Sequence, residues 1–394
     1  MSAVIEARCP RVAMVAGEAS GDLLGSHLIG ALRERIGDVD FFGIGGPKMM
    51  THGFNALYPM ERLAVRGYVE VLRHFWGIAR IRRDLRRQLL ARPPDLFIGI
   101  DAPEFNLGLE RALKARGVPT VHYVSPQIWA WRGRRIRSID KAVSHLLVLF
   151  PFEQKIYQDA GIKCTFVGHP LADILPDEPD RASAREHLKL PRHATVIALL
   201  PGSRQSELKY LGDLFAQTAA LITSKRPDIR FLAPMVTSET HDLFSAALQR
   251  LLPDQTPSVR ILHGHAHLAM TAADVVLVAS GTATLEAALL KRPMVITYRV
   301  SEISFWIFRL QMYLPYVGLP NVLAGRHLVP ELLQHDATPA NLARALLNIL
   351  DEPLVGATLQ QHFTVLHRTL RQNNAEKAAL AVLPYLEHRG FGAV

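Results

Sequence analysis

The fold is decided by residues 275–286, which read Val275-Val276-Leu277-Val278-Ala279-Ser280-Gly281-Thr282-Ala283-Thr284-Leu285-Glu286. An apolar run typical of a buried strand leads into a short polar loop, and a helical pattern begins directly after the glycine. Gly281 lets the backbone approach a ligand, Ser280 can cap the helix, and the amides of the first helical turn can bind an anion. The segment predicts a strand–loop–helix unit of an α/β fold with a phosphate-binding loop.

A second loop of the same kind lies upstream, where the apolar run Val196–Leu200 ends in Pro201-Gly202-Ser203-Arg204. Two turns suited to phosphate in one α/β domain indicate a diphosphate, and the acid Glu286 is suited to sugar or ribose hydroxyls. The sequence therefore predicts a site for a sugar nucleotide. We expect it to be formed by Gly202, Ser203, Arg204, Ser280, Gly281, Thr282, Ala283, Thr284 and Glu286.

Composition limits the class of protein. The chain has 394 residues, of which 49% are hydrophobic, and this is enough for two domains with complete cores. Cys9 and Cys164 are too few for a disulfide framework or a zinc cluster. The first ten residues contain no apolar run of a signal peptide, and no stretch reaches the roughly 18 apolar residues of a membrane-spanning helix. We expect a cytoplasmic protein.

The net charge of +9 is concentrated in one segment. Nine arginines and three acids lie between Glu61 and Arg92, next to a bulky apolar pattern with helical spacing. A basic face beside an aromatic face is typical of an interfacial helix at an anionic membrane, and an ordinary helix packed on a sheet with a solvated arginine face remains the alternative. Nucleic acid is less favoured because no nucleic-acid motif accompanies the charge. The expected membrane contacts are Tyr68, Val69, Leu72, Phe75 and Trp76.

Apolar strands alternate with helical stretches along the chain, which predicts parallel sheets with helices on both faces. We expect two doubly wound, Rossmann-like α/β domains facing a cleft, the glycosyltransferase B architecture, with nucleotide in the second domain. The domains would span residues 1–172 and 193–394, joined by a linker at 173–192 rich in proline and acids, and the chain after Pro339 would be helical. The expected strands are Val12–Ala16, Phe41–Ile44, Leu96–Ile100, Thr120–Val124, Leu146–Phe150, Thr165–Val167, Thr195–Leu200, Arg230–Pro234, Val259–Leu262, Asp274–Ala279 and Met294–Tyr298.

In the first domain, the loop after the first strand carries Glu18, Ser20 and Asp22. Its two acids disfavour phosphate, so it would suit neutral hydroxyls or an amine of an acceptor substrate. The alternative is a plain turn in which Ser20 or Asp22 caps the following helix.

Asp101 is the sharpest catalytic candidate. It follows the strand Leu96–Ile100, and ligands of open α/β sheets bind at the carboxyl ends of the strands. A carboxylate there can accept a proton from an acceptor hydroxyl, which contributes roughly 100- to 10,000-fold in rate. The alternative is a cap for the helix after Pro103, and Glu104 is a second candidate carboxylate.

The stretch Tyr123–Arg132 contains two tryptophans, and further cations follow it. Trp129 and Arg132 could hold an acyl sugar or its phosphate, because guanidinium groups match phosphate oxygens. Buried aromatic residues at the domain edge are the alternative.

Several motifs in order resemble bacterial lipid-A-disaccharide synthase, from about residue 11 to 390. The resemblance implies an inverting glycosyltransferase of the B fold. Such an enzyme joins UDP-2,3-diacylglucosamine to the 6-hydroxyl of 2,3-diacylglucosamine 1-phosphate and forms the β-1,6-linked tetraacyl disaccharide 1-phosphate and UDP. The matching motifs are Gly17–Asp22, Phe42–Met49, Ile100–Asn106, Tyr123–Arg132, Phe166–Leu171, Leu200–Arg204 with Glu207, Ser280–Glu286 and Leu319–Asn321.

The resemblance assigns the essential aspartate to Asp101, the leaving-group arginine to Arg204 and a late nucleotide-site asparagine to Asn321. This chain has Glu104 where the family usually has aspartate, and Arg66 where it usually has methionine. We expect no cofactor and no metal. Asp38-Val39-Asp40 precedes a strand at the wrong end of a sheet for nucleotide, and His263, His265 and His267 alternate without nearby acids.

Lipid substrates would place the site beside the inner leaflet, and this favours peripheral association with the inner membrane through the segment 61–92. A nonhydrolysing UDP-sugar epimerase and a catalytically idle binding protein remain as alternatives. The helical tail could fold on its own first domain or on that of a partner, and the family suggests a homodimer formed by exchange of carboxyl-terminal parts.

Overall fold

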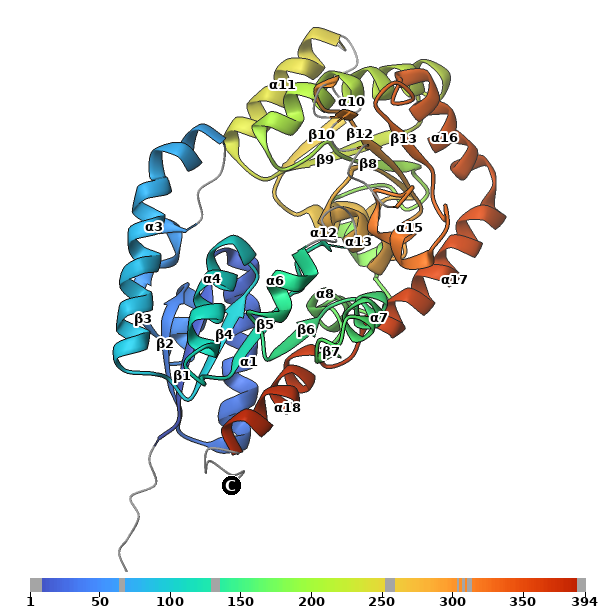
Figure 1. Cartoon of the computed structure of the whole chain (residues 1–394). Helices are drawn as coiled ribbons and strands as arrows, with labels where there is room; N and C mark the ends of the chain where they lie inside the picture. The colour runs from blue at the N-terminus through green and yellow to red at the C-terminus, as the bar shows by residue number, and fades with distance from the viewer. Residues whose placement is uncertain are drawn as a thin grey trace, which may run out of the picture. The chain divides into compact units, whose positions relative to one another are not determined.

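The computed structural model describes residues 9–63, 68–128, 135–251, 259–302, 305–306, 309 and 314–387, and for residues 68–75 the backbone only. The chain forms two compact units: Met1–Pro170 together with Leu370–Val394, and Leu171–Thr369 (Figure 1). From the sequence we expected units at residues 1–172 and 193–394. In the structure, residues 370–394 belong to the first unit and not to the second. Within the described ranges, no helix combines the length and apolarity needed to cross a bilayer.

The first unit is built on a parallel sheet of seven strands in the order β3-β2-β1-β4-β5-β6-β7. The order reverses direction between β1 and β4, so this pair forms the topological switch point of the sheet. The strands are β1 (Arg11–Ala16), β2 (Asp40–Gly45), β3 (Asn55–Pro59), β4 (Leu96–Ile100), β5 (Thr120–Tyr123), β6 (His145–Val148) and β7 (Cys164–Phe166).

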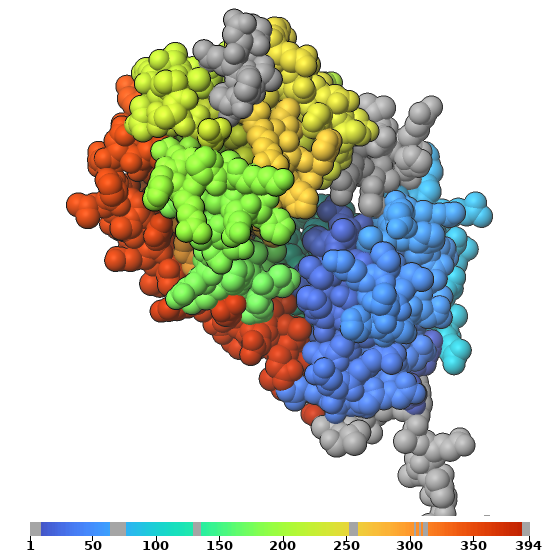
Figure 2. Space-filling view, turned by 180° about the vertical axis from the view of Figure 1, so that it is seen from behind, coloured from blue at the N-terminus to red at the C-terminus, as the bar shows by residue number. Residues whose placement is uncertain are grey.

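Helices surround this sheet. Ile81, Leu85 and Leu89 repeat at helical spacing along α3 and pack into a core with Phe97 of β4. The helix α18 packs beside α1, and Figure 2 shows residues from late in the chain, in red, next to residues from early in the chain, in blue. The helices are α1 (Ala19–Ile36), α2 (Pro47–Thr51), η1 (Met60–Arg62), α3 (Tyr68–Ala91), α4 (Pro103–Lys114), α6 (Ile136–Asp140), α7 (Pro151–Asp159) and α18 (Asn374–Glu387), with α8 (Pro170–Ile174) at the boundary.

Two polar anchors fix α18 to the first unit. The Asn374 amide donates to the Gly168 carbonyl oxygen over 2.8 Å, and its oxygen accepts a hydrogen bond from the Tyr123 hydroxyl. Glu376 pairs with Arg35 of α1. In this single chain the tail therefore folds on its own first unit, one of the two arrangements that the sequence left open.

The second unit repeats the same topology with six parallel strands in the order β10-β9-β8-β11-β12-β13. Its switch point lies between β8 and β11. The strands are β8 (Val196–Leu200), β9 (Arg230–Met235), β10 (Val259–His263), β11 (Val275–Ala279), β12 (Met294–Tyr298) and β13 (Glu331–Leu333).

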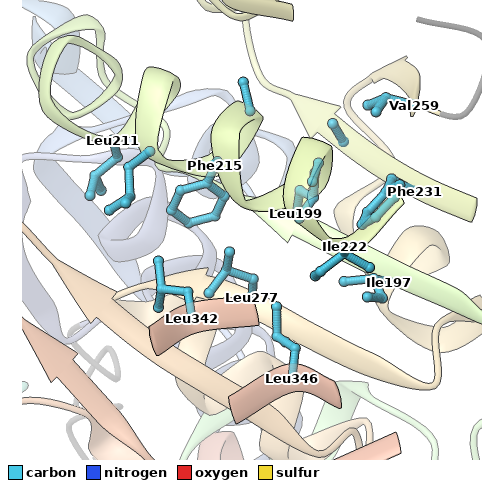
Figure 3. Packing of buried hydrophobic residues seen from close by; sticks show 14 of the residues in the cluster. Ile197, Leu199, Leu211, Phe215, Ile222, Phe231, Val259, Leu277, Leu342 and Leu346 are labelled. Carbon is cyan, nitrogen blue, oxygen red and sulfur yellow. The ribbon is translucent and has the colours of Figure 1, made fainter. Parts of the chain in front are cut away.

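The core of the second unit joins its central strands to two long helices. Phe215 from α10 and Leu342 and Leu346 from α16 pack against Leu199 and Leu277 of the sheet (Figure 3). The helices of this unit are α9 (Arg181–His187), α10 (Gln205–Lys225), α11 (Ser238–Leu251), α12 (Ala266–Ala272), α13 (Thr282–Leu289), α15 (Leu319–Ala324), α16 (Pro339–Asp351) and α17 (Pro353–Leu370).

The fold class predicted from the sequence is confirmed, and every predicted strand is present with ends shifted by at most a few residues. The helical pattern after Pro339 is also confirmed. Two strands were missed, β3 and β13, which are the outermost strands at one edge of each sheet. The expected linker contains α9, whose cap is Asp180: its carboxylate accepts a hydrogen bond from the Ser183 amide over 2.9 Å. The stretch rich in acids and proline therefore leads directly into helix α9, with Asp180 as its cap.

Candidate functional site

The predicted residues follow the strands at the two switch points. In the first unit Ala16 of β1 pairs with Ile100 of β4, and in the second Leu200 of β8 pairs with Val278 of β11. The loops after paired parallel strands lie next to each other, at the edge of the sheet where ligands of such folds bind. Within each unit, the structure therefore brings the predicted loops together.

Asp101 is the first residue after β4, and its side chain is half-buried. Its amide donates to the Tyr123 carbonyl oxygen over 2.8 Å, and its own carbonyl accepts from the Asn106 side chain over 2.8 Å. Asp101 and Ala102 have φ angles of 52° and 43°, a left-handed conformation that costs on the order of 1 to 3 kcal/mol for a non-glycine residue. Strain of this kind is typical of functional sites.

The helix-cap alternative for Asp101 is wrong. The capping residue of α4 is Ala102, and no side chain caps this helix. Among the described residues, none donates a hydrogen bond to the Asp101 carboxylate. Glu104, by contrast, is 72% exposed and its carboxylate lies 2.7 Å from the Arg135 guanidinium. Asp101 is therefore better suited than Glu104 to act as a base.

The loop after β1 corrects one prediction. Asp22 is buried, and its carboxylate accepts hydrogen bonds from the amides of Gly46, Lys48 and Met49 at 2.9 to 3.0 Å. It therefore fixes the start of α2 and is not available to an acceptor. Capping of α1 by Ser20 or Asp22 is also wrong, because Glu18 stands at the cap position and no side chain bonds there.

Glu18 and Ser20 are exposed and remain candidates for the acceptor side. Gly17, just before them, lies close to Ala102, since a Cβ on Gly17 would lie 3.1 Å from the Ala102 Cβ. The loop after β1 and the Asp101 turn are therefore in contact. The other predicted acceptor residues, Trp129 and Arg132, lie outside the described residues.

The loop between β11 and α13, which begins at Ser280, has the predicted form with one change. Gly281, with φ 150°, occupies the cap position of α13, and the Ser280 hydroxyl donates instead to the Val317 carbonyl oxygen over 3.1 Å. Thr284 is buried and donates to the Gly281 carbonyl oxygen over 2.7 Å. Gly281 and Thr282 are exposed and Ala283 is half-buried. The first turn of α13 can therefore present its amides to an anion.

The loop after β8 is occupied by an internal carboxylate. Glu207 accepts hydrogen bonds from the amides of Ser203 and Arg204 at 2.9 and 3.2 Å. Gly202, with φ 124°, makes room for it, since a Cβ there would lie 2.4 Å from the Glu207 carboxylate oxygen. The amides of Ser203 and Arg204, which we expected to face a phosphate, are engaged by Glu207 in this structure, and the exposed side chains of Ser203 and Arg204 are the groups that this loop offers to a ligand.

Glu286 has a partner that the sequence did not suggest. His267 of α12 lies 3.0 Å from its carboxylate. The hydrogen bond to Glu286 raises the pKa of His267, although burial opposes this. The raised pKa favours the protonated form of His267, and this imidazole holds the Glu286 carboxylate in place.

The side chain of Asn321, which the resemblance assigns to the nucleotide site, is engaged inside the protein. It is fully buried and bonds to the backbone of Leu328 and Val329 and to the Glu331 carboxylate. Glu331 in turn accepts hydrogen bonds at 2.9 Å from the amides of Val317 and Gly318. Asn321 and Glu331 therefore shape the segment that contacts Ser280. Glu331 was missed because a single acid in a short edge strand gives no signal in the sequence.

The basic segment forms a helix, α3, as predicted. Its described carboxyl-terminal part has an apolar inner face and exposed arginines at positions 80, 83, 86 and 87. Trp76 is 77% exposed. The side chains of the other expected membrane contacts lie outside the described residues; these contacts are Tyr68, Val69, Leu72 and Phe75.

Comparison with known proteins identifies the family. A sequence model of lipid-A-disaccharide synthetase matches residues 12–382. The chain belongs to this family. The lipid-A-disaccharide synthases of Methylobacillus flagellatus and of an Azoarcus species are each 58% identical to it, over 96% of this chain and over 100% and 96% of their own lengths. The resemblance drawn from the motifs is thus confirmed, and the chain is a glycosyltransferase of lipid A biosynthesis.

Solved structures share the fold of this chain at low identity. The UDP-GlcNAc 2-epimerase of Neisseria meningitidis, bound to UDP-GlcNAc, superposes with a TM-score of 0.61 at 13% identity, covering 96% of this chain and all of that one. A calicheamicin glycosyltransferase superposes with a TM-score of 0.60 at 14% identity, covering 97% and 99% of the two chains. At these identities the likeness shows the fold alone, so the epimerase alternative gains no support from it.

Proposed function

We propose that this chain transfers 2,3-diacylglucosamine from UDP-2,3-diacylglucosamine to the 6-hydroxyl of 2,3-diacylglucosamine 1-phosphate with inversion. The products are the β-1,6-linked tetraacyl disaccharide 1-phosphate and UDP. Family membership supplies the overall reaction. The observation that carries the assignment of roles is the strained Asp101 turn at the switch point of the first sheet.

Asp101 acts as the general base. Its carboxylate takes the proton of the acceptor 6-hydroxyl while that oxygen attacks the anomeric carbon of the donor from the face opposite UDP. A new carbon–oxygen bond forms as the bond to the diphosphate breaks, and UDP leaves with the electron pair. One displacement inverts the anomeric centre, and a positioned base of this kind contributes roughly 100- to 10,000-fold in rate.

The second unit stabilises the leaving group. The amides of the first turn of α13, beginning at Thr282, and the Arg204 guanidinium bind the diphosphate as negative charge develops on it. Glu286, held by His267, accepts hydrogen bonds from the ribose hydroxyls. Asn321 supports this loop from behind through Glu331.

The chain binds the surface of the inner membrane through α3. Its acyl substrates reside in a bilayer, and the described part of α3 carries an exposed tryptophan and four exposed arginines that suit an anionic leaflet. This proposal places the acceptor side of the protein, with Glu18 and Ser20, at the lipid surface.

The reaction is tested by measuring UDP release from the diacyl donor in detergent micelles, with and without the acceptor. The parent should release UDP only with acceptor, and Asp101→Ala should lower the rate at least 100-fold, as expected for a lost base. Asp159→Ala, which changes an exposed aspartate of the same unit, serves as control and should retain activity. Release without acceptor, or an active Asp101→Ala variant, contradicts the proposal.

Membrane association is tested by flotation with vesicles that contain anionic lipid. The double variant Phe75→Ser and Trp76→Ser should be recovered less with the vesicles than the parent. Leu354→Ser with Val365→Ser is a matched control, because it removes two exposed apolar side chains from α17. Equal recovery of the first double variant and the parent would refute the contact.

A further inference from the structure

A buried polar group lies beneath the Asp101 turn and has no part in the mechanism above. It consists of Asn106, Glu110 and His122, whose side chains have 0% exposure. His122 Nδ1 lies 2.7 Å from Glu110 Oε1. Gly99 of β4 makes room for the carboxylate, since a Cβ there would lie 2.2 Å from Glu110 Oε1. A glycine inside a buried strand thus marks the close approach of this charged group.

Stability does not account for this group. Asn106 Oδ1, Glu110 Oε2 and His122 Nε2 have no hydrogen-bond partner among the described residues. A buried polar atom without a hydrogen-bond partner destabilises the folded state. Buried ion pairs are often no more stabilising than apolar side chains of the same volume. Leucine and phenylalanine at these positions would fill the same space at lower cost, so the polar group has another role.

The group is linked to the backbone of Asp101. Asn106 and Glu110 lie one turn apart on the same face of α4. From there the Asn106 amide donates to the Asp101 carbonyl oxygen over 2.8 Å. Gly99 and His122 are paired residues of β4 and β5, and Asp101 follows Gly99 by two positions. The Glu110–His122 contact therefore joins α4 to β5 beside Gly99, two positions before the left-handed turn that connects β4 to α4.

Electrostatics couples the two side chains to each other. Burial lowers the pKa of His122, but the charge and hydrogen bond of Glu110, together with the charge of Asp101, raise it overall. Burial also raises the pKa of the Glu110 carboxyl, and His122 opposes this effect. Each of the two buried groups therefore depends on the other as its partner.

We propose that Glu110 and His122 are positioning residues for the general base: their contact ties α4 to β5 and so holds the Asp101 turn, which connects β4 to α4. This inference rests on the proposed function, because it requires Asp101 to accept the proton. Neither residue contacts substrate, and neither gains or loses a proton in the reaction. Their contribution is to keep the base in one conformation.

The test measures kcat, KM for both substrates, UDP affinity and Tm for Glu110→Gln and His122→Asn. Both changes keep the approximate shape and remove the charge pair. We expect kcat to fall about 10- to 100-fold, a part of the roughly 100- to 10,000-fold that a general base supplies. KM, UDP affinity and Tm should stay close to parental values. His145→Gln is the matched control: His145 is buried in the same sheet and bonds to Thr165 at 2.8 Å, so its kcat should be near parental.

A double variant, Glu110→Met with His122→Leu, guards against loss of folding. It removes both charges together and leaves neither partner unpaired, so it should fold at least as stably as the parent while kcat stays low. Parental kcat in a folded Glu110→Gln variant overturns the inference. A fall in kcat that is fully explained by a smaller fraction of folded, UDP-binding protein also overturns the inference.

Asp101→Ala separates the two proposals. If it is inactive while the Glu110 and His122 variants are fully active, only the positioning role fails. If Asp101→Ala itself keeps its turnover, the base assignment in the proposed function fails, and the positioning role fails with it.

Discussion

Replacing Asn321 with alanine should destabilise the second unit without directly removing a nucleotide contact. The side chain is fully buried and makes four hydrogen bonds of 2.7 to 2.9 Å, to the backbone of Leu328 and Val329 and to Glu331. If each group that loses this partner costs about 1 kcal/mol, the free energy of unfolding falls by about 3 to 4 kcal/mol. For a domain of this size that corresponds to a Tm lower by about 6 to 16 °C.

Scanning calorimetry measures the change in Tm, and titration calorimetry at 15 °C measures UDP affinity in the protein that remains folded. Asn348→Ala is the matched control, because Asn348 is exposed on α16 and its side chain supports no buried group. Its Tm should equal that of the parent within about 1 °C. A parental Tm for Asn321→Ala combined with UDP binding weakened tenfold would refute the reasoning and show direct contact with the nucleotide.

Three further changes test other parts of the structure. Gly202→Ala places a Cβ 2.4 Å from the Glu207 carboxylate at φ 124°, so chemical denaturation should show a loss of about 2 kcal/mol, and unchanged stability would contradict the clash. The pKa of His267 is raised by its hydrogen bond to Glu286, so its stabilisation is full below about pH 6.5 and is lost as pH rises through the folded pKa. His267→Gln should therefore cost more stability at pH 5.5 than at pH 8.5, and an equal cost at both would disprove the coupling. Burial lowers the pKa of His169 to about 4, so the unfolded chain binds a proton first as pH falls below about 6.5, and stability drops down to about pH 4. Urea titrations of His169→Gln should show less acid sensitivity than the parent, whereas an identical pH profile would show that His169 is not the cause.

The central strands could be predicted from sequence because parallel strands buried on both faces are continuous apolar runs. Leu96–Ile100 and Val275–Ala279 are of this kind, and both occur where predicted. The edge strands β3 and β13 gave no such run. In β3 residues alternate between exposed and half-buried, and β13 has only three residues. Their pairing is decided by the neighbouring strand, which a local pattern does not contain.

The position of Asp101 could be predicted for the same reason, since the end of a strong strand is a local feature. The roles of Asp22 and Asn321 could not. Asp22 bonds to amides 24 to 27 residues away, and Asn321 bonds to groups that come next to it only when β13 joins the sheet. A polar side chain near a predicted site looks the same in sequence whether it faces a ligand or an internal amide.

Three carboxylates near the predicted loops bind backbone amides of the protein itself. Asp22, Glu207 and Glu331 each accept hydrogen bonds from two or more backbone amides of a loop. Each bond is charge-assisted and holds its loop in one conformation without a ligand. These loops are therefore shaped before substrate arrives, which lowers the entropy cost of binding. The Asp101 carboxylate accepts no such bond from the described residues, and this difference supports the proposal that Asp101 is the general base.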